Sequence, residues 1–165
     1  MTGVRRSVGV AVVAVMAALA VLLAALSAFA AARASHRQAL DEARKQAAAA
    51  AASAVPIVLS YDYRHLPRDF ARAEAQLTPN FRKQYIRTTA KGVQPLAAKY
   101  RAISSADVTA AGVVDNGVDR AVVLVFVSQT VTNSLLSAPR LDRSRINVTL
   151  VQAGGRWLID KLAPV

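Results

Sequence analysis

The hydrophobic and polar positions divide the chain into an uncharged N-terminal stretch, an alanine- and arginine-rich middle and a strand-rich end. Between Arg6 and Arg33 no residue is charged, and Ala, Val, Leu, Met and Phe fill most positions. As a helix, residues 7–32 would be about 39 Å long, more than the roughly 30 Å of hydrocarbon in a bilayer. A helix of this length without a polar face needs apolar surroundings on all sides. The pattern therefore predicts a transmembrane anchor.

The rival interpretation of this stretch is a signal peptide cleaved after Ala30, because residues 28–30 have the small-x-small form of a cleavage site. The apolar part of a signal peptide spans only about 7–15 residues, so the length favours an uncleaved anchor. Arg5 and Arg6 favour a cytoplasmic tail over residues 1–6, although further basic residues follow the anchor. We expect a single-pass protein of the cell (inner) membrane with a cytoplasmic N-terminus and an extracytoplasmic C-terminal domain.

The segment after the anchor, residues 33–55, contains neither glycine nor proline and is rich in alanine, the strongest helix former. We expect it to continue the anchor helix into solution as a helical stalk. Pro56 lacks a main-chain donor and should disturb the helix there. The exported domain would then span residues 56–165.

A second helix is predicted from Leu66-Pro67, because proline suits the first turn of a helix. Its apolar positions recur at helical spacing and should face the core: Phe70, Ala73 and Leu77. Three arginines repeat every fourth residue and should line another face, as a solvated surface or as a contact with lipid or a partner: Arg64, Arg68 and Arg72.

A third helix should begin at Thr78, a good N-cap that is followed by a proline at the first helical position. Gly92 and Pro95 should kink this helix near its end. Its predicted apolar stripe consists of Phe81, Tyr85, Thr89, Val93, Leu96 and Tyr100.

From Ile103 onward the hydrophobic period changes to two, which is typical of β-strands. The sequence predicts four strands and a hairpin turn at residues 115–117; the strands are Ser104–Val114, Arg120–Thr132, Leu141–Gln152 and Arg156–Leu162. Residues 121–127 are apolar throughout, so the second strand should be central and covered on both faces. In the third strand, Ile146, Val148 and Leu150 should point inward, and Arg143, Arg145, Asn147 and Thr149 outward.

Helices that precede an antiparallel meander and pack on one of its faces make an α+β fold. The predicted architecture is therefore an N-terminal transmembrane helix, then three helices packed on a curved four-stranded antiparallel sheet. If the sheet curves around the helices, the domain becomes a cone with an internal pocket.

The formal charge of +11 suits an anionic partner, either phospholipid head groups or an acidic protein. A domain exported beside a bilayer rarely meets nucleic acid, and no motif for binding it is present, so we expect no nucleic-acid partner. The chain has no cysteine, which excludes disulfides, thiol catalysis and cysteine-ligated metal sites.

Several short motifs, in their order along nearly the whole chain, match one family. They are the single anchor, the Ala/Arg-rich stalk, Tyr61-Asp62-Tyr63, the helix carrying Leu77, Phe81 and Tyr85, the strand end Gln129-Thr130-Val131-Thr132, and the closing Gly155-Arg156-Trp157-Leu158 with Pro164-Val165. With these features the chain resembles the mammalian-cell-entry (Mce)-associated membrane proteins of actinobacteria.

The resemblance implies a cone-shaped domain similar to nuclear transport factor 2 (a cystatin-like roll) and to the periplasmic domain of a type IV secretion component. It also implies an accessory role beside Mce importers, which move sterols or fatty acids through the cell envelope. Such proteins look like stabilisers of the transporter assembly. The resemblance brings no catalytic residues with it.

The residues themselves offer little chemistry. The two histidines, His36 and His65, lie far apart without a His-carboxylate cluster, and neither a nucleophile elbow nor a phosphate-binding loop is present. We expect no metal, no cofactor and no enzyme activity. Asp62 between Tyr61 and Tyr63 is the one combination that could imitate a proton-abstracting pocket.

Two candidate residues have structural alternatives. Asp62 could instead cap the following turn, with the neighbouring tyrosines packed at a pocket rim. Trp157, the only tryptophan, could pack in the core or stack on a ligand.

The leading hypothesis is a non-enzymatic scaffold that binds the proteins of a membrane-bound lipid-import complex. One alternative is a cone pocket that holds an apolar ligand such as a fatty acid or sterol. Another is a pocket enzyme of the isomerase or cyclase type, which would rest on Asp62 and its tyrosines.

Overall fold

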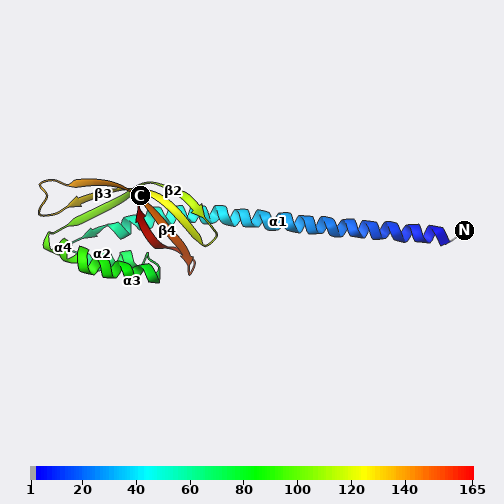
Figure 1. Ribbon diagram of the computed structural model, residues 1–165, viewed down its shortest axis with the longest axis horizontal. Helices are drawn as coiled ribbons and strands as arrows, with labels where there is room; N and C mark the ends of the chain where they lie inside the picture. Colours follow the sequence, from blue (N-terminus) through cyan, green and yellow to red (C-terminus); the bar gives the residue numbers. More distant parts are fainter. Residues whose placement is uncertain (1–2) are drawn as a thin grey trace. The chain divides into compact units, whose positions relative to one another are not determined.

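The computed structural model describes residues 3–165, although not the side chains of residues 3–15, 17, 18, 20 and 21 (Figure 1). The chain divides into two compact units, Met1–Ala39 and Leu40–Val165. The first helix, α1 (Gly3–Leu59), supplies the first unit and begins the second.

Half of the predicted transmembrane anchor falls outside the described side chains. Among the residues that the structure describes, no helix combines the length and the apolar character needed to cross a membrane. The unit Leu40–Val165 is the part in which the fold and its sites can be followed residue by residue.

The second unit is an α+β domain, as predicted, and Figure 1 shows its short helices gathered on one side of the sheet. After α1 the elements are β1 (Tyr61–Asp62), α2 (Leu66–Glu74), α3 (Pro79–Thr88), a π-helix η1 (Thr89–Val93), α4 (Gln94–Lys99), β2 (Ile103–Asn116), β3 (Arg120–Thr132), β4 (Arg140–Ala153) and β5 (Arg156–Pro164). The strands form one antiparallel sheet in the order β1-β2-β3-β4-β5.

The sheet has five strands, where the sequence predicted four. The extra strand, β1, is two residues long and pairs only with Ile103 and Ser104 at the start of β2. So short a segment carries no periodic signal, because its backbone is held by tertiary pairing and not by its own pattern. The predicted bounds of β3 are confirmed, whereas β2 runs on to Asn116 and the hairpin loop lies at residues 117–119.

The alanine-rich part of α1 lies in the core of the domain. Small residues along one face of the helix are buried in the core cluster that the sheet shares: Ala47, Ala51, Ala54, Val55 and Val58. Their spacing of three to four residues is that of one helix face, and methyl side chains let the helix backbone approach the strands closely. Residues 40–55, expected in the stalk, therefore belong to the compact domain.

Pro56 does not end α1, contrary to expectation. The helix continues through it to Leu59, and the Ser60 N–H donates to the Pro56 carbonyl at 3.0 Å. Proline removes one hydrogen bond from the helix. Val55 and Val58 are buried on either side of it, and this packing holds the last turn in place.

Strand β3 is covered on one face only, which corrects the sequence prediction. Its inward residues are at most 2% exposed: Ala121, Val123, Val125 and Val127. On the outer face Val122 and Leu124 are half-buried, and Phe126 is 41% exposed. An unbroken apolar run looks the same whether one face or both are covered, so the sequence could not separate the two cases.

The inner face of the sheet, where an internal pocket was expected if the sheet curved around the helices, is covered by α1. Ala47, Ala51 and Val55 of the helix are 0% exposed, as are Leu150 and Ile159 of the sheet. The core of the roll is therefore a packed helix–sheet interface.

The third predicted helix contains a π-helical turn. Residues Thr89–Val93 form η1, which ends two residues before Pro95, a residue that cannot donate to the carbonyl four residues earlier. The wider turn also shifts the phase of the buried stripe, so that Ala97 is buried while Leu96 is 55% exposed. Periodicity alone placed Leu96 inside.

Candidate functional site

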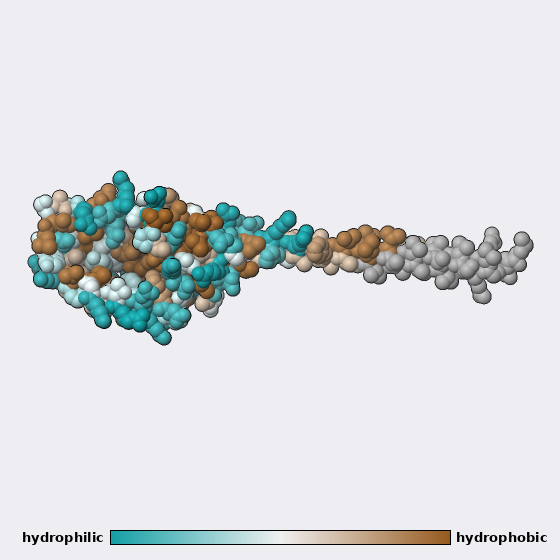
Figure 2. Space-filling model, viewed as in Figure 1, coloured by the Kyte–Doolittle hydropathy of each residue, from teal (hydrophilic) through white to brown (hydrophobic). Residues whose placement is uncertain are grey.

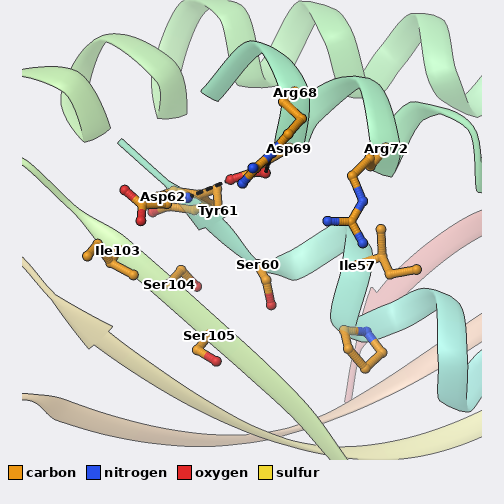
Figure 3. Close-up of a pocket in the computed structure, with 11 residues that line it drawn as sticks. Ile57, Ser60, Tyr61, Asp62, Arg68, Asp69, Arg72, Ile103, Ser104 and Ser105 are labelled. Atoms are coloured by element: carbon orange, nitrogen blue, oxygen red, sulfur yellow. Dashed lines mark hydrogen bonds and ion pairs between the residues drawn. The ribbon is translucent and has the colours of Figure 1, made fainter. Parts of the chain in front are cut away.

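A pocket of about 400 Å³ opens where the end of α1, β1, α2 and the start of β2 meet (Figure 3). Four of the residues singled out in the sequence line it: Tyr61, Asp62, Arg68 and Arg72. The remaining lining comes from Pro56, Ile57, Ser60, Asp69, Ile103, Ser104 and Ser105. We call this hollow the α2 pocket.

The fold of the chain around Asp62 explains how the α2 pocket is built. The main-chain N–H of Asp62 donates to Asp69 Oδ2 at 3.0 Å, which ties β1 to the first turn of α2. Asp62 in turn accepts the N–H of Arg64 at 2.9 Å, an Asx-type turn that redirects the chain into α2. The structural alternative for Asp62, a cap on the following turn, is therefore confirmed.

Asp62 is also held in its ionised form. The Arg64 guanidinium donates to both of its carboxylate oxygens through Nε, at 3.0 Å each. Hydrogen bonds from Arg64 lower the pKa of Asp62 to about 2. A carboxylate with so low a pKa is a weak base, and it is no acid at neutral pH. This arrangement is the opposite of the raised pKa that a proton-abstracting pocket needs.

The arginine series divides between two roles. Arg64 precedes α2 and is held by Asp62, whereas Arg68 and Arg72 lie on α2 and line the α2 pocket. Arg68 Nε donates to Asp69 Oδ1 at 3.0 Å. Arg72 has no ion-pair partner among the side chains that the structure describes, and Figure 3 shows it reaching toward Ile57.

Aromatic packing holds Tyr61, one of the residues that line the α2 pocket. Tyr61 stacks on Phe70 with ring centroids 5.9 Å apart, and Phe70 contacts Tyr85 at 6.0 Å. The Tyr85 hydroxyl donates to the Val58 carbonyl at 3.1 Å. Burial raises the pKa of Tyr61, and burial raises that of Tyr85 to about 12, so both phenols stay protonated.

The other two predicted pocket residues lie elsewhere. Tyr63 lies between two guanidinium groups, those of Arg64 at 5.9 Å and Arg101 at 5.8 Å from its ring. Trp157, on β5, packs against the core, and its Nε1–H donates to Gln46 Oε1 of α1 at 3.3 Å. Trp157 is therefore partly buried against the core.

Sequence reasoning missed the serines of the α2 pocket. Ser60 Oγ accepts the N–H of Ala106, and Ser104 Oγ donates to the Leu59 carbonyl, both at 2.9 Å. Gln129 Nε2 donates to Ser104 Oγ at 2.6 Å. These serines occur in ordinary strand and helix-end contexts, and only the pairing of β1 with β2 brings them together.

The α2 pocket is an open surface site whose lining combines two arginines, two aspartates and serine hydroxyls with aliphatic side chains. Within the described part of the chain, no group of three His, Asp or Glu residues is placed to hold a metal ion. Arginine and serine side chains over an aliphatic floor are suited to binding a carboxylate or phosphate group.

Comparison with known proteins places the chain in a family. The family model described as "Uncharacterized protein Rv1363c/MT1408-like" matches residues 10–165. The chain belongs to this family.

Two relatives from Mycobacterium tuberculosis extend the comparison. "Uncharacterized protein Rv1362c" is 39% identical over 129 residues, which are 78% of this chain and 59% of that protein. "Outer membrane protein Rv1973" is 37% identical over 123 residues, 74% of this chain and 76% of that protein. The chain thus matches about three-fifths of the length of the first of these relatives.

Solved structures share the fold of the Rv1363c/MT1408-like domain. An IcmL-like type IV secretion system protein from Legionella pneumophila has a TM-score of 0.63 at 11% identity, covering 74% of this chain and 93% of that one. The periplasmic domain of DotI has a TM-score of 0.61 at 10% identity, with 72% and 91% covered. Agrobacterium tumefaciens VirB8 has a TM-score of 0.55 at 12% identity, with 71% and 88% covered. At these identities the likeness establishes the fold.

Proposed function

We propose that this protein is a non-enzymatic accessory protein that holds together a membrane-bound complex of the cell envelope. The observation that carries the proposal is the inner face of the sheet, which α1 covers. Ala47, Ala51 and Val55 of α1 are 0% exposed and pack against the strands, so the helix fills the interior of the domain. The α2 pocket and a second hollow lie on the surface of the domain, where partner proteins can reach them.

The membrane part of the proposal is an anchor over residues 7–32 with the N-terminus in the cytoplasm. Six large apolar side chains of this segment are each more than half exposed: Met16, Leu19, Leu22, Leu23, Leu26 and Phe29. Figure 2 shows apolar residues on the described part of this stretch of helix. Such a surface is stable in lipid and costly in water, since each buried CH₂ contributes about 0.8 kcal/mol.

The contact part of the proposal assigns the α2 pocket to a carboxylate of a partner protein. Arg72 offers an uncommitted guanidinium at its mouth, and Arg68 is 60% exposed beside it. The names of the structural neighbours support a place in a multiprotein assembly, since the Legionella protein is a type IV secretion system protein. The name of Rv1973, an outer membrane protein, supports a place in the envelope.

The finer proposal is that the complex is an Mce-type importer of sterols or fatty acids. Its support is the resemblance carried by Tyr61-Asp62-Tyr63 and by the closing strand. Deleting the gene should lower the abundance of the importer subunits and the uptake of labelled cholesterol or palmitate. If the abundance of the importer subunits and the uptake of the labelled lipid were unchanged, the protein would not serve an Mce-type importer. The complex that it supports would then have to be sought elsewhere.

The role of the α2 pocket is tested by complementing that deletion with variants. R68A/R72A removes both pocket guanidinium groups, and R82A/R87A removes two exposed arginines of α3 as the matched control. We expect only the control to restore the abundance of the complex. Equal restoration by both variants would show that the α2 pocket is not the contact.

A further inference from the structure

The edge of β4 is left unpaired over its first residues. The ladder between β4 and β5 begins with Ile146 opposite Pro164, and the N–H of Val165 adds one more bond to the Arg145 carbonyl at 3.0 Å. Residues 140–144 of β4 pair with β3 and have no partner strand on their other side in the described chain. We call them the free β4 edge.

The direction of the main-chain groups on this edge follows from the antiparallel ladder. Arg145 faces the β5 side, because its carbonyl accepts from Val165. Main-chain groups alternate between the two sides of a strand, so those of Arg143 and Leu141 face the same open side. Five residues span about 17 Å, which is the length of an ordinary strand. The free β4 edge can therefore receive one short strand.

A groove of about 480 Å³ lies beside the free β4 edge. Its lining combines an apolar floor with two arginines: Thr109, Phe126, Val127, Ser128, Arg143, Ser144, Arg145, Pro164 and Val165. Phe126 and Val165 are 41% and 65% exposed. Arg143 and Arg145 have no ion-pair partner among the described side chains, whereas Arg140 is paired with Asp142 at 2.9 Å.

We propose that the free β4 edge and this groove bind an extended segment of a partner protein, which adds to the sheet as a sixth strand. The segment carries an acidic residue opposite Arg143 and, two residues later, an apolar residue opposite Leu141, which is 53% exposed. Strand addition supplies main-chain hydrogen bonds, and the alternate side chains on one face supply the specificity.

Charge decides between this occupant and a second copy of the chain. Two β4 edges that paired with each other would bring their arginines together, and like charges on paired strands are destabilising. Charged side chains also protect edge strands from self-association. The same arginines attract an acidic strand. The inference rests on the proposed function only in requiring a protein partner, and it holds for any complex that the protein serves.

A synthetic peptide tests the proposal on the full chain in a mild detergent. The probe is a fluorescein-labelled peptide of about six residues with glutamate and valine two positions apart and threonine elsewhere. Its binding is followed by fluorescence anisotropy at low salt. We expect saturable binding, roughly tenfold weaker for R143E/R145E and unchanged for the control R82E/R87E. A peptide with lysine in place of glutamate should bind R143E/R145E more tightly than the wild type.

Two further variants separate strand addition from simple charge attraction. R143A removes the charge and keeps the outward N–H, whereas R143P removes both, and proline is tolerated at the open side of an edge strand. Trp157 fluorescence checks that each variant is folded. We expect R143P to bind the peptide more weakly than R143A.

Some results would overturn the proposal. These are equal binding by R143E/R145E and the wild type, or equal binding by R143A and R143P. A third is efficient disulfide-linked dimer formation by R143C, which would assign the free β4 edge to a second copy. Because the chain has no cysteine of its own, such a dimer would report only this position. If the peptide did not bind but the protein were still purified with an envelope complex, only the proposal for the free β4 edge would fail, and the proposed function would remain.

Discussion

Replacing Ala51 with leucine tests the assignment of the alanine-rich segment to the core of the domain. Ala51 is 0% exposed and packs against the sheet, so A51L forces additional carbon atoms into a filled interface. Overpacking of this kind costs about 1–3 kcal/mol. Ala49 lies on the exposed side of the same helix, and A49L changes only a surface residue with good helix propensity.

The size of the expected shift follows from the size of the domain. Unfolding entropy is about 2.1 cal/mol/K per residue, or about 0.26 kcal/mol/K for the unit Leu40–Val165. A loss of 1–3 kcal/mol should therefore lower the Tm of A51L by about 4–11 °C. The Tm of A49L should stay within about 2 °C of the wild type.

The assay uses the only tryptophan as its reporter. Trp157 contacts Gln46 of α1, so its fluorescence follows the separation of this helix from the sheet. Thermal unfolding of both variants is compared with the wild type in the same detergent. Equal Tm values for A51L and A49L would refute the reasoning, because a solvent-exposed stalk accepts leucine equally well on every face.

Three further variants probe single interactions of the domain. The pKa of Asp62 is lowered to about 2 in the folded protein. Its ionised carboxylate therefore stabilises the fold above the unfolded-state pKa of about 4, and this stabilisation is lost as the pH falls toward 2. Between these pH values, urea titrations should show a steeper loss of unfolding free energy for the wild type than for D62N. Y85F should lower the free energy of unfolding by about 1 kcal/mol at neutral pH, because it loses the hydrogen bond to Val58, and a higher free energy of unfolding would contradict this. Because the pKa of Tyr85 is raised to about 12, the wild type should lose stability between about pH 10 and 12, and Y85F should lose less. T78A should lose about 1 kcal/mol in urea unfolding, because Thr78 Oγ1 caps α3 by accepting the N–H of Phe81, and an unchanged midpoint would show that the cap is redundant.

Much of the domain could be predicted from local patterns. The alternation of apolar and polar residues in β4 correctly placed Ile146, Val148 and Leu150 inside. The change of hydrophobic period at Ile103 correctly separated the helices from the sheet. Thr78 and Pro79 marked the start of α3 because an N-cap and a proline at the first position act through neighbouring residues. Signals of this kind need no knowledge of the rest of the fold.

The errors arose where distant segments decide the outcome. A run of alanines has no distinct apolar face, so the sequence did not show that Ala47 and Ala51 are buried against the sheet. Pro56 remains helical because its neighbours are packed. The phase shift at Ala97 depends on the π-helical turn, which the periodicity of the sequence cannot register.

The candidate site was predicted in part. Arg68 and Arg72 lie together in the α2 pocket with Tyr61 because the spacing of four residues survives in α2. Trp157 was grouped with them through its chemistry alone and lies on β5, against Gln46. The free β4 edge could not be foreseen, since it depends on where the ladder between β4 and β5 begins.

The central claim is that this protein works inside a complex of envelope proteins. The most direct test is purification of the tagged full-length protein from native membranes in a mild detergent, with bound proteins and lipids identified together by mass spectrometry. The account predicts stoichiometric recovery of the subunits of one membrane-bound complex, and their loss from the R68A/R72A variant. Recovery of the protein alone, or of a bound lipid without protein partners, would contradict it.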